Sequence, residues 1–563
     1  MNVYQKIVFL LLIIFIPFAN AEAQRTKKVV AKPIIPQDKR EVALDTITPK
    51  TVTVTSAFKP SLRSAAKINF TAATPVFDSS KIPLTYSIPS QNLFFSYQPV
   101  AIKPLALAID TSVLWENHQY IKAGFGNYAT PYLEGGVAFG DGQNTMVSLH
   151  GKYTSSKGDL PFQQFSKTGV EALGIFSGAH DLETTAKLYF SNNDQYKYGY
   201  TAKTAFTKEQ LEQQFNTVGF ELGLKNKKAN DFGMTYHPQI KVSYFSDNRD
   251  ASEINFAASL AINKTFGRMF AFDLKGTADL TTLKVPTPAN IVNNLFYIDP
   301  TIQFKTPNFQ LNAGIQPSWD NHIFSVLPNF TAEIKIKDEK FVLQAGWIGY
   351  FNKNTYQSLA AFNPYIEQPN ALLNTKVSEQ YAGFKGSVGK HFTYNGKLSF
   401  LKISNQPLFT NDTAAQNTQT FKIFNETNLQ AVRIHGEIGY TDQEKLSLTA
   451  GVSLTQYTSQ EKYDQPWGLV PFEITGALRY KVLKDLHLKA DVFFWDGTHY
   501  RTKTQSQKLD PALDLNIGGE YTILSKLNLF LQFNNVLNTH YQRWNQYDVL
   551  GFNVVAGVVY SFH

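Results

Sequence analysis

Residues 431–440 read AVRIHGEIGY, and polar and apolar side chains alternate along this stretch, with Arg433 on one face and Ile434 on the other. The stretches LHLKADVFFW (486–495) and LNLFLQFN (527–534) alternate in the same way. A period of two places successive side chains on opposite faces of a strand, so each stretch predicts a β-strand with one apolar and one wet face. Such strands fit either a soluble sandwich or a membrane barrel with a polar lumen.

The lengths of the links between these strands favour the membrane barrel. From residue 352 onward, long links alternate with short ones, the long ones covering 352–376, 404–430, 459–470, 497–510 and 536–550. A membrane barrel has tight turns at one end and long loops at the other, whereas a sandwich has no reason to sort its links. The sequence therefore predicts an all-β fold: a transmembrane antiparallel β-barrel of about 22 strands over residues 118–563. In 118–180 the alternation of link lengths fails.

The first residues predict export. Lys6 precedes an apolar run over 8–19, and Ala21-Glu22-Ala23 is a small-residue cleavage site, so residues 1–23 are expected to be a signal peptide. An uncleaved anchor helix is the alternative, but the apolar run is short for a membrane span. The chain contains no Cys, which excludes disulfides, thiol chemistry and a lipid-anchored amino terminus.

Residues 24–117 form a segment of a different composition. They contain nine prolines and no glycine, and the first of the 34 glycines of the chain is Gly124. Because proline fixes φ and removes a donor, an extended periplasmic arm is expected here. Its apolar end, NLFFSYQPVAIKPLALAI (92–109), is expected to pack against the barrel or to lie inside it.

Signals for chemistry or nucleic-acid binding are weak. The formal charge is +8, but the Lys and Arg residues are dispersed rather than gathered in a stripe, which disfavours nucleic acid. The sequence lacks G-x-S-x-G, H-E-x-x-H and phosphate-binding glycine motifs, and none of the 11 His has metal-ligand spacing with another. No enzyme activity, cofactor or metal site is therefore expected.

The C-terminal third resembles the barrel of TonB-dependent outer-membrane receptors. Asn535–Tyr541 reads NVLNTHY, similar to that family's N-L-x-N-x-x-Y segment, and the chain ends on the strand GFNVVAGVVYSFH. In this strand Gly557, Tyr560 and Phe562 match the terminal pattern that the barrel-assembly machinery reads in outer-membrane proteins. Val555 departs from the pattern, because a polar residue is usual there. The resemblance implies an outer-membrane location, with outer-membrane lipid around the barrel and the arm and C-terminus in the periplasm.

A short segment near the amino terminus resembles the one that precedes the plug domain in these receptors, and it consists of Thr51, Val52, Thr53, Val54 and Thr55. The resemblance implies a periplasmic or inner-membrane coupling protein as a partner, contacted through residues 25–67. An ordinary β-branched strand is the alternative. A complete plug is not expected, since only about 60 residues separate Thr55 from the barrel and they lack the glycines that tight turns require.

Two functions remain open at this stage. The first is a receptor or transport protein without a normal plug, in which the polar residues Arg433, Glu437, Lys489 and Asp491 line the lumen. The second is a non-transporting scaffold or accessory subunit of a larger outer-membrane complex. The loops at 352–372 and 538–550 are rich in Tyr, Trp and Asn and are expected to grip a ligand or partner.

Overall fold

The computed structural model describes residues 119–178, 181–199, 206–286, 290–411, 419–442, 445–501 and 506–562. The predicted signal peptide, the proline-rich arm and the segment Thr51–Thr55 lie outside these ranges.

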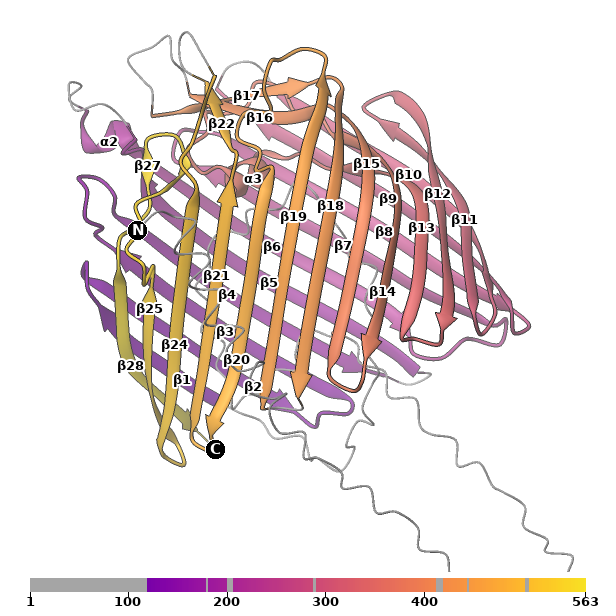
Figure 1. The fold of residues 1–563 in the computed structure, drawn as a ribbon, viewed down its shortest axis with the longest axis horizontal. Helices are drawn as coiled ribbons and strands as arrows, with labels where there is room; N and C mark the ends of the chain where they lie inside the picture. The colour runs from indigo at the N-terminus through magenta and orange to yellow at the C-terminus, as the bar shows by residue number, and fades with distance from the viewer. Residues whose placement is uncertain are drawn as a thin grey trace, which may run out of the picture. The chain divides into compact units, whose positions relative to one another are not determined.

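Twenty-two antiparallel strands form one sheet, which closes because the first strand pairs with the last (Figure 1). The strands of the barrel are β1 (Gln119–Gly126), β2 (Thr130–Gly140), β3 (Thr145–Ser156), β4 (Phe165–Ser177), β5 (Leu182–Tyr196), β6 (Glu212–Asn226), β7 (Met234–Asp247), β8 (Ser252–Phe266), β9 (Phe270–Lys284), β10 (Ile291–Lys305), β11 (Phe309–Asp320), β12 (Ile323–Lys337), β13 (Phe341–Asn352), β14 (Thr375–Val388), β15 (Phe392–Ser404), β18 (Leu429–Asp442), β19 (Leu446–Gln460), β20 (Phe472–Leu483), β21 (Leu486–Asp496), β24 (Ala512–Leu524), β25 (Leu527–Asn534) and β28 (Asn553–Phe562). The predicted fold class and strand number are confirmed.

The two ends of the barrel differ in their links. The links 353–374 between β13 and β14 and 405–428 between β15 and β18 lie at one end, here called the loop end. The opposite end, here called the turn end, has tight connections such as 484–485 between β20 and β21. The alternation fails near the start of the barrel because the β1–β2 link at the loop end, residues 127–129, is itself a tight turn.

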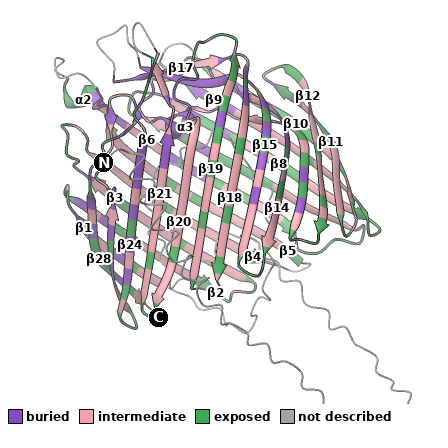
Figure 2. Ribbon diagram, in the orientation of Figure 1, coloured by how far each residue is buried: buried purple, intermediate pink, exposed green. Residues whose placement is uncertain are grey.

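Side chains alternate across the barrel wall as the sequence predicts (Figure 2). On β8 the outward Ile254 is 50% exposed, whereas the neighbouring Glu253 is 1% exposed. Ile434 on β18 is 53% exposed, and Arg433 beside it points to the opposite face of the sheet. An apolar outer surface and a polar inner surface are the arrangement that a barrel adopts in lipid.

Short elements lie outside the wall, all in links at the loop end. They are α2 (Lys208–Leu211), α3 (Tyr356–Phe362), β16 (Gln406–Asn411), β17 (Phe421–Glu426), β22 (His499–Arg501), β23 (Ser506–Lys508), β26 (Gln542–Trp544) and β27 (Tyr547–Asp548). No helix in the described ranges is long and apolar enough to cross a membrane.

Candidate functional site: the loop cap

The C-terminal pattern lies at the seam where the barrel closes. Tyr560 and Phe562 project outward, 43% and 37% exposed, with their rings 4.8 Å apart. Gly557 faces inward, and a Cβ built on it would meet a ring carbon of Phe530 at 2.6 Å. Val555 also faces inward, where it is 4% exposed and packs in one cluster with Phe530. The apolar residue at 555 therefore fills the inner side of the seam.

The four candidate lumen residues lie on two separated strands. Arg433 on β18 donates from Nε to Thr455 Oγ1 at 3.0 Å. Asp491 on β21 forms an ion pair of 2.9 Å with Arg479 of β20. Because β19 and β20 lie between these strands, the structure does not gather Arg433 and Glu437 with Lys489 and Asp491 into one site.

The described residues of five links at the loop end pack together into one assembly, here called the loop cap. The links are 353–374, 405–428, 461–471, 497–511 and 535–552. Glu367 N donates to Phe421 O at 2.9 Å, and Phe409 N donates to Trp467 O at 3.2 Å, so backbone hydrogen bonds join separate links. The loops thus form a folded unit across the loop end (Figure 1).

Aromatic side chains form the core of the loop cap. Trp544 of β26 is 6% exposed, and its ring centroid lies 5.4 Å from Phe362, 5.3 Å from Phe409 and 5.4 Å from Phe421. These three partners come from α3, β16 and β17, so one indole ring joins three loop elements. The aromatic residues that the sequence marked as ligand contacts in 352–372 and 538–550 are therefore largely used for packing.

Helix α3 is fixed to the wall through its amino terminus. The carboxylate of Glu253 on β8 accepts hydrogen bonds from Tyr356 N at 2.6 Å and Gln357 N at 3.1 Å. The Tyr356 hydroxyl donates to Asp247 Oδ2 at 2.8 Å. Free N–H groups and the helix dipole favour a negative charge at this position, so Glu253 both caps and locates α3.

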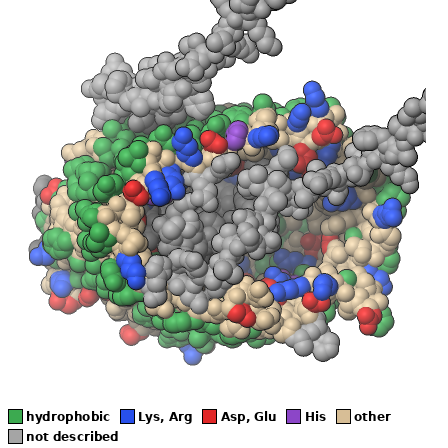
Figure 3. Space-filling model, turned by 90° about the horizontal axis from the view of Figure 1, so that it is seen from below, with side chains coloured by type: hydrophobic (Ala, Val, Ile, Leu, Met, Phe, Trp, Pro, Cys, Tyr) green, Lys and Arg blue, Asp and Glu red, His purple; other side chains and the backbone are tan. Residues whose placement is uncertain are grey.

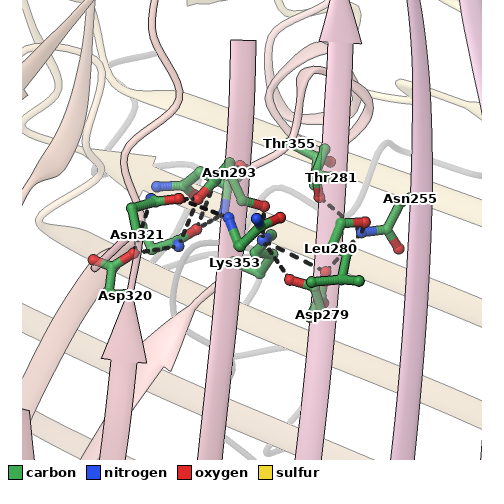
Figure 4. A network of polar contacts seen from close by, with 12 residues as sticks. Asn255, Asp279, Leu280, Thr281, Asn293, Asp320, Asn321, Lys353 and Thr355 are labelled. Carbon is green, nitrogen blue, oxygen red and sulfur yellow. Dashed lines mark hydrogen bonds and ion pairs between the residues drawn. The ribbon is translucent and has the colours of Figure 1, made fainter. Parts of the chain in front are cut away.

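An amide network attaches the start of the same loop to three neighbouring strands (Figure 4). Asn293 and Asn374 exchange side-chain hydrogen bonds of 2.8 and 2.9 Å, and Asn374 Nδ2 also donates to Asp320 Oδ1 at 2.7 Å. Lys353 Nζ donates to Asp279 O at 3.0 Å, and burial lowers the pKa of its ammonium group. A network in which the polar groups have hydrogen-bond partners holds a loop in one position.

A second carboxylate holds the far side of the cap. Glu426, at the end of β17, is 0% exposed and accepts hydrogen bonds from Lys462 N at 3.0 Å and Tyr463 N at 2.9 Å. Trp467 in the same loop is 1% exposed and donates from Nε1 to Ser506 Oγ at 3.0 Å. Glu426 could not be recognised from the sequence, because a single acidic residue in a loop has no periodic pattern around it.

The turn end contains a hollow of about 590 Å³ in the wall of β6 to β12. Side-chain amides donate hydrogen bonds to its carboxylates: Asp273 accepts from Asn263 and Gln303, and Asp299 accepts from Asn329 at 2.8 Å. Figure 3 looks onto this end and shows Lys, Arg, Asp and Glu side chains around the opening. Within the described ranges, no three His, Asp or Glu residues are grouped as a metal site.

Solved structures of outer-membrane receptors have a similar fold. The FrpB iron transporter from Neisseria meningitidis has a TM-score of 0.62 at 12% identity, covering 80% of this chain and 82% of that one. The siderophore receptor PirA from Pseudomonas aeruginosa has a TM-score of 0.57 at 11% identity, covering 79% of this chain and 80% of that one. A mutant of the ferric enterobactin receptor PfeA from Pseudomonas aeruginosa has a TM-score of 0.58 at 12% identity, covering 79% and 80%.

The structure and these similarities define a closed antiparallel β-barrel of 22 strands with the fold of outer-membrane receptors. More particularly, the chain has the barrel fold of TonB-dependent receptors, as the sequence resemblance predicts. At 11–12% identity the similarity establishes the fold alone. Iron transport is stated of FrpB and siderophore reception of PirA, and neither is transferred to this chain. Neither a protein-family model nor a curated protein sequence matches the chain.

Proposed function

We propose that the protein is a receptor-type or transport-related barrel of the outer membrane, in which the loop cap is a gate at the cell surface. One observation carries this proposal: buried clusters and hydrogen bonds join the described residues of five loops at one end of a wide barrel whose inner wall is polar. The loop end then faces the exterior, and the arm and C-terminus are periplasmic.

A gate is needed because a barrel of this size is wide. Barrels of 16–18 strands leave an aqueous channel, and those of 22 strands are wider and usually obstructed. Residues 24–117 are too few and too poor in glycine for a normal plug. The loops themselves are therefore expected to close the barrel. The polar inner residues, including Arg433 and Glu437, then serve as a hydrated wall for solute that has passed the gate.

The second candidate is a non-transporting scaffold subunit of a larger outer-membrane complex. It is favoured by the anchoring of the cap through Glu253, Lys353 and Glu426, because moving elements are usually drawn from the least stable parts of a fold. In this case the arm, through residues 25–67, docks to a periplasmic partner without energising transport.

Thiol accessibility in living cells separates the two candidates, because the chain has no native Cys. Thr410 on β16 is 3% exposed in the cap, so a Thr410→Cys variant reacts with a membrane-impermeant maleimide only when the cap opens. If the cap is a gate, the maleimide labels this cysteine slowly, and the labelling rate falls when the proton-motive force is dissipated. Complete protection in energised cells contradicts gating and favours the scaffold.

The matched control for this assay is Thr207→Cys, since Thr207 is exposed beside α2 at the loop end. It is expected to be labelled at once with or without energy, and failure of this control refutes the surface location. Purification in mild detergent then identifies partners. A sub-stoichiometric periplasmic coupling protein supports transport, whereas a stable equimolar complex supports the scaffold.

A further inference from the structure

A buried arginine lies at the centre of the loop cap. Arg543 of β26 is 5% exposed, and its guanidinium carbon lies 4.2 Å from the ring centroid of Trp544 and 5.2 Å from that of Phe362. Its Nη2 donates to Gly468 O at 3.0 Å. Its Nε and Nη1 are buried and have no hydrogen-bond partner.

This charge has no paired carboxylate among the described residues. No ion pair joins Arg543 to an acidic group within the part of the chain that the structure describes. Glu473 and Tyr457 are the titratable groups that act on its charge electrostatically. Burial lowers the pKa of Arg543 to about 10, so the guanidinium still carries its charge at neutral pH. A buried charge without a partner is strongly destabilising, because neither water nor an opposite charge compensates it.

The surroundings add further unused hydrogen-bonding capacity. Gly468 N donates to His499 O at 2.9 Å, which brings the 497–511 loop next to the carbonyl that Arg543 contacts. The Thr498 hydroxyl, one residue earlier, is buried and has no partner. Gly468 has a φ of +78°, and a Cβ there would lie 3.0 Å from the Trp544 ring, so only glycine allows this close approach.

We propose that the loop cap binds a small oxyanion through the free Nε and Nη1 N–H groups of Arg543. A carboxylate, sulfate or phosphate group accepts from a guanidinium in matching geometry, and these charge-assisted bonds are the strong ones. Because Arg543 also donates to Gly468 O, an anion that holds its guanidinium in place stabilises the contact between the 535–552 and 461–471 loops. The binding site does not depend on whether the cap is a gate.

The test uses the full-length protein in detergent and hydrogen exchange of peptides from 461–471 and 535–552. Acetate, sulfate and phosphate are titrated against chloride at equal ionic strength and pH. At about ten times its dissociation constant, a bound oxyanion is expected to slow exchange of these peptides roughly tenfold. Which of the three anions acts at the lowest concentration distinguishes a carboxylate site from a sulfate or phosphate site.

Arg543→Met removes the charge while keeping an apolar chain, and it is expected to abolish the oxyanion effect. Sulfate and phosphate also stabilise proteins by exclusion from their surfaces, so an effect that persists in this variant is non-specific and overturns the proposal. Arg479→Met is the matched control, since Arg479 is 51% exposed and pairs with Asp491, and it is expected to retain the full effect.

A carboxylate of the chain itself is the competing explanation. Asp412, outside the described residues, follows Asn411 of β16 in the cap. If it neutralises Arg543, then Asp412→Asn accelerates exchange in 535–552 and oxyanions have no effect on the unsubstituted protein. That outcome refutes the oxyanion site, whereas an oxyanion effect that Asp412→Asn leaves intact supports it.

Discussion

Replacing Trp544 by alanine is expected to loosen the loop cap while leaving the barrel intact. The indole is 6% exposed and contacts rings from α3, β16 and β17 within 5.5 Å, and it also stacks on Arg543. No residue of the barrel wall contributes to these four contacts. The loss of stability is therefore expected in the cap and not in the sheet.

The magnitude follows from the burial. Truncating a buried Trp or Phe to Ala typically costs about 3–5 kcal/mol, because apolar contacts are lost and a cavity remains. Every 1.4 kcal/mol is about a factor of ten in an equilibrium constant. If exchange proceeds through opening of the cap, amide exchange in 353–374 and 405–428 should accelerate by about two to three and a half orders of magnitude.

Hydrogen exchange with mass spectrometry measures this effect peptide by peptide. Trp319→Ala is the matched control, since Trp319 on β11 is 40% exposed on the outer surface and contacts Phe324 rather than the cap. This control should leave exchange in the cap unchanged. Equal cap exchange in Trp544→Ala and in the unsubstituted protein would refute the account of the cap as one packed unit.

Three further predictions test other parts of the structure. Glu253→Gln removes the negative charge at the amino terminus of α3 and should cost about 1–2 kcal/mol locally, which appears as faster exchange of the helix while distant strands stay unchanged. Burial lowers the pKa of Lys197, in the 197–211 link at the loop end, from 10.5 to about 7. Between these values the unfolded state binds the extra proton, so the free energy of unfolding rises with pH. Trp fluorescence melts should show the unfolding midpoint rising from pH 7 toward pH 10, and Lys197→Met should reduce this slope. Gly557→Ala places a Cβ 2.1 Å from a backbone oxygen of β1 and should lower the temperature of heat-induced unfolding on detergent gels by at least several degrees, whereas Gly169→Ala has open space and should have little effect.

The barrel could be predicted from the sequence because its signals are local and repeated. Alternation in stretches such as 431–440 predicts which side chains face outward from the barrel, and sorted link lengths predict a barrel with one turn end and one loop end. The β1–β2 link broke this pattern, because a tight turn stands there at the loop end.

The cap could not be predicted in the same way. Its core joins residues far apart in the chain, such as Phe362 and Trp544, and irregular loops have no period that marks a buried face. Composition showed aromatic loops but could not separate residues that bind a ligand from residues that pack on one another. The apolar residue at 555 could not be explained from the sequence either. Its reason is packing against Phe530 in the seam, which only the structure reveals.

Closure of the loop cap at the cell surface is tested most directly by a disulfide across it. Asn411 of β16 and Asn545 of the 535–552 loop exchange hydrogen bonds of 3.5 and 3.4 Å, so an Asn411→Cys/Asn545→Cys variant places two thiols on residues that contact each other across the cap. In intact cells treated with an impermeant oxidant, the account predicts near-complete disulfide formation, seen as a mobility shift on a non-reducing gel. Two thiols that stay reduced and are both labelled by an impermeant maleimide would show an open cap and contradict it.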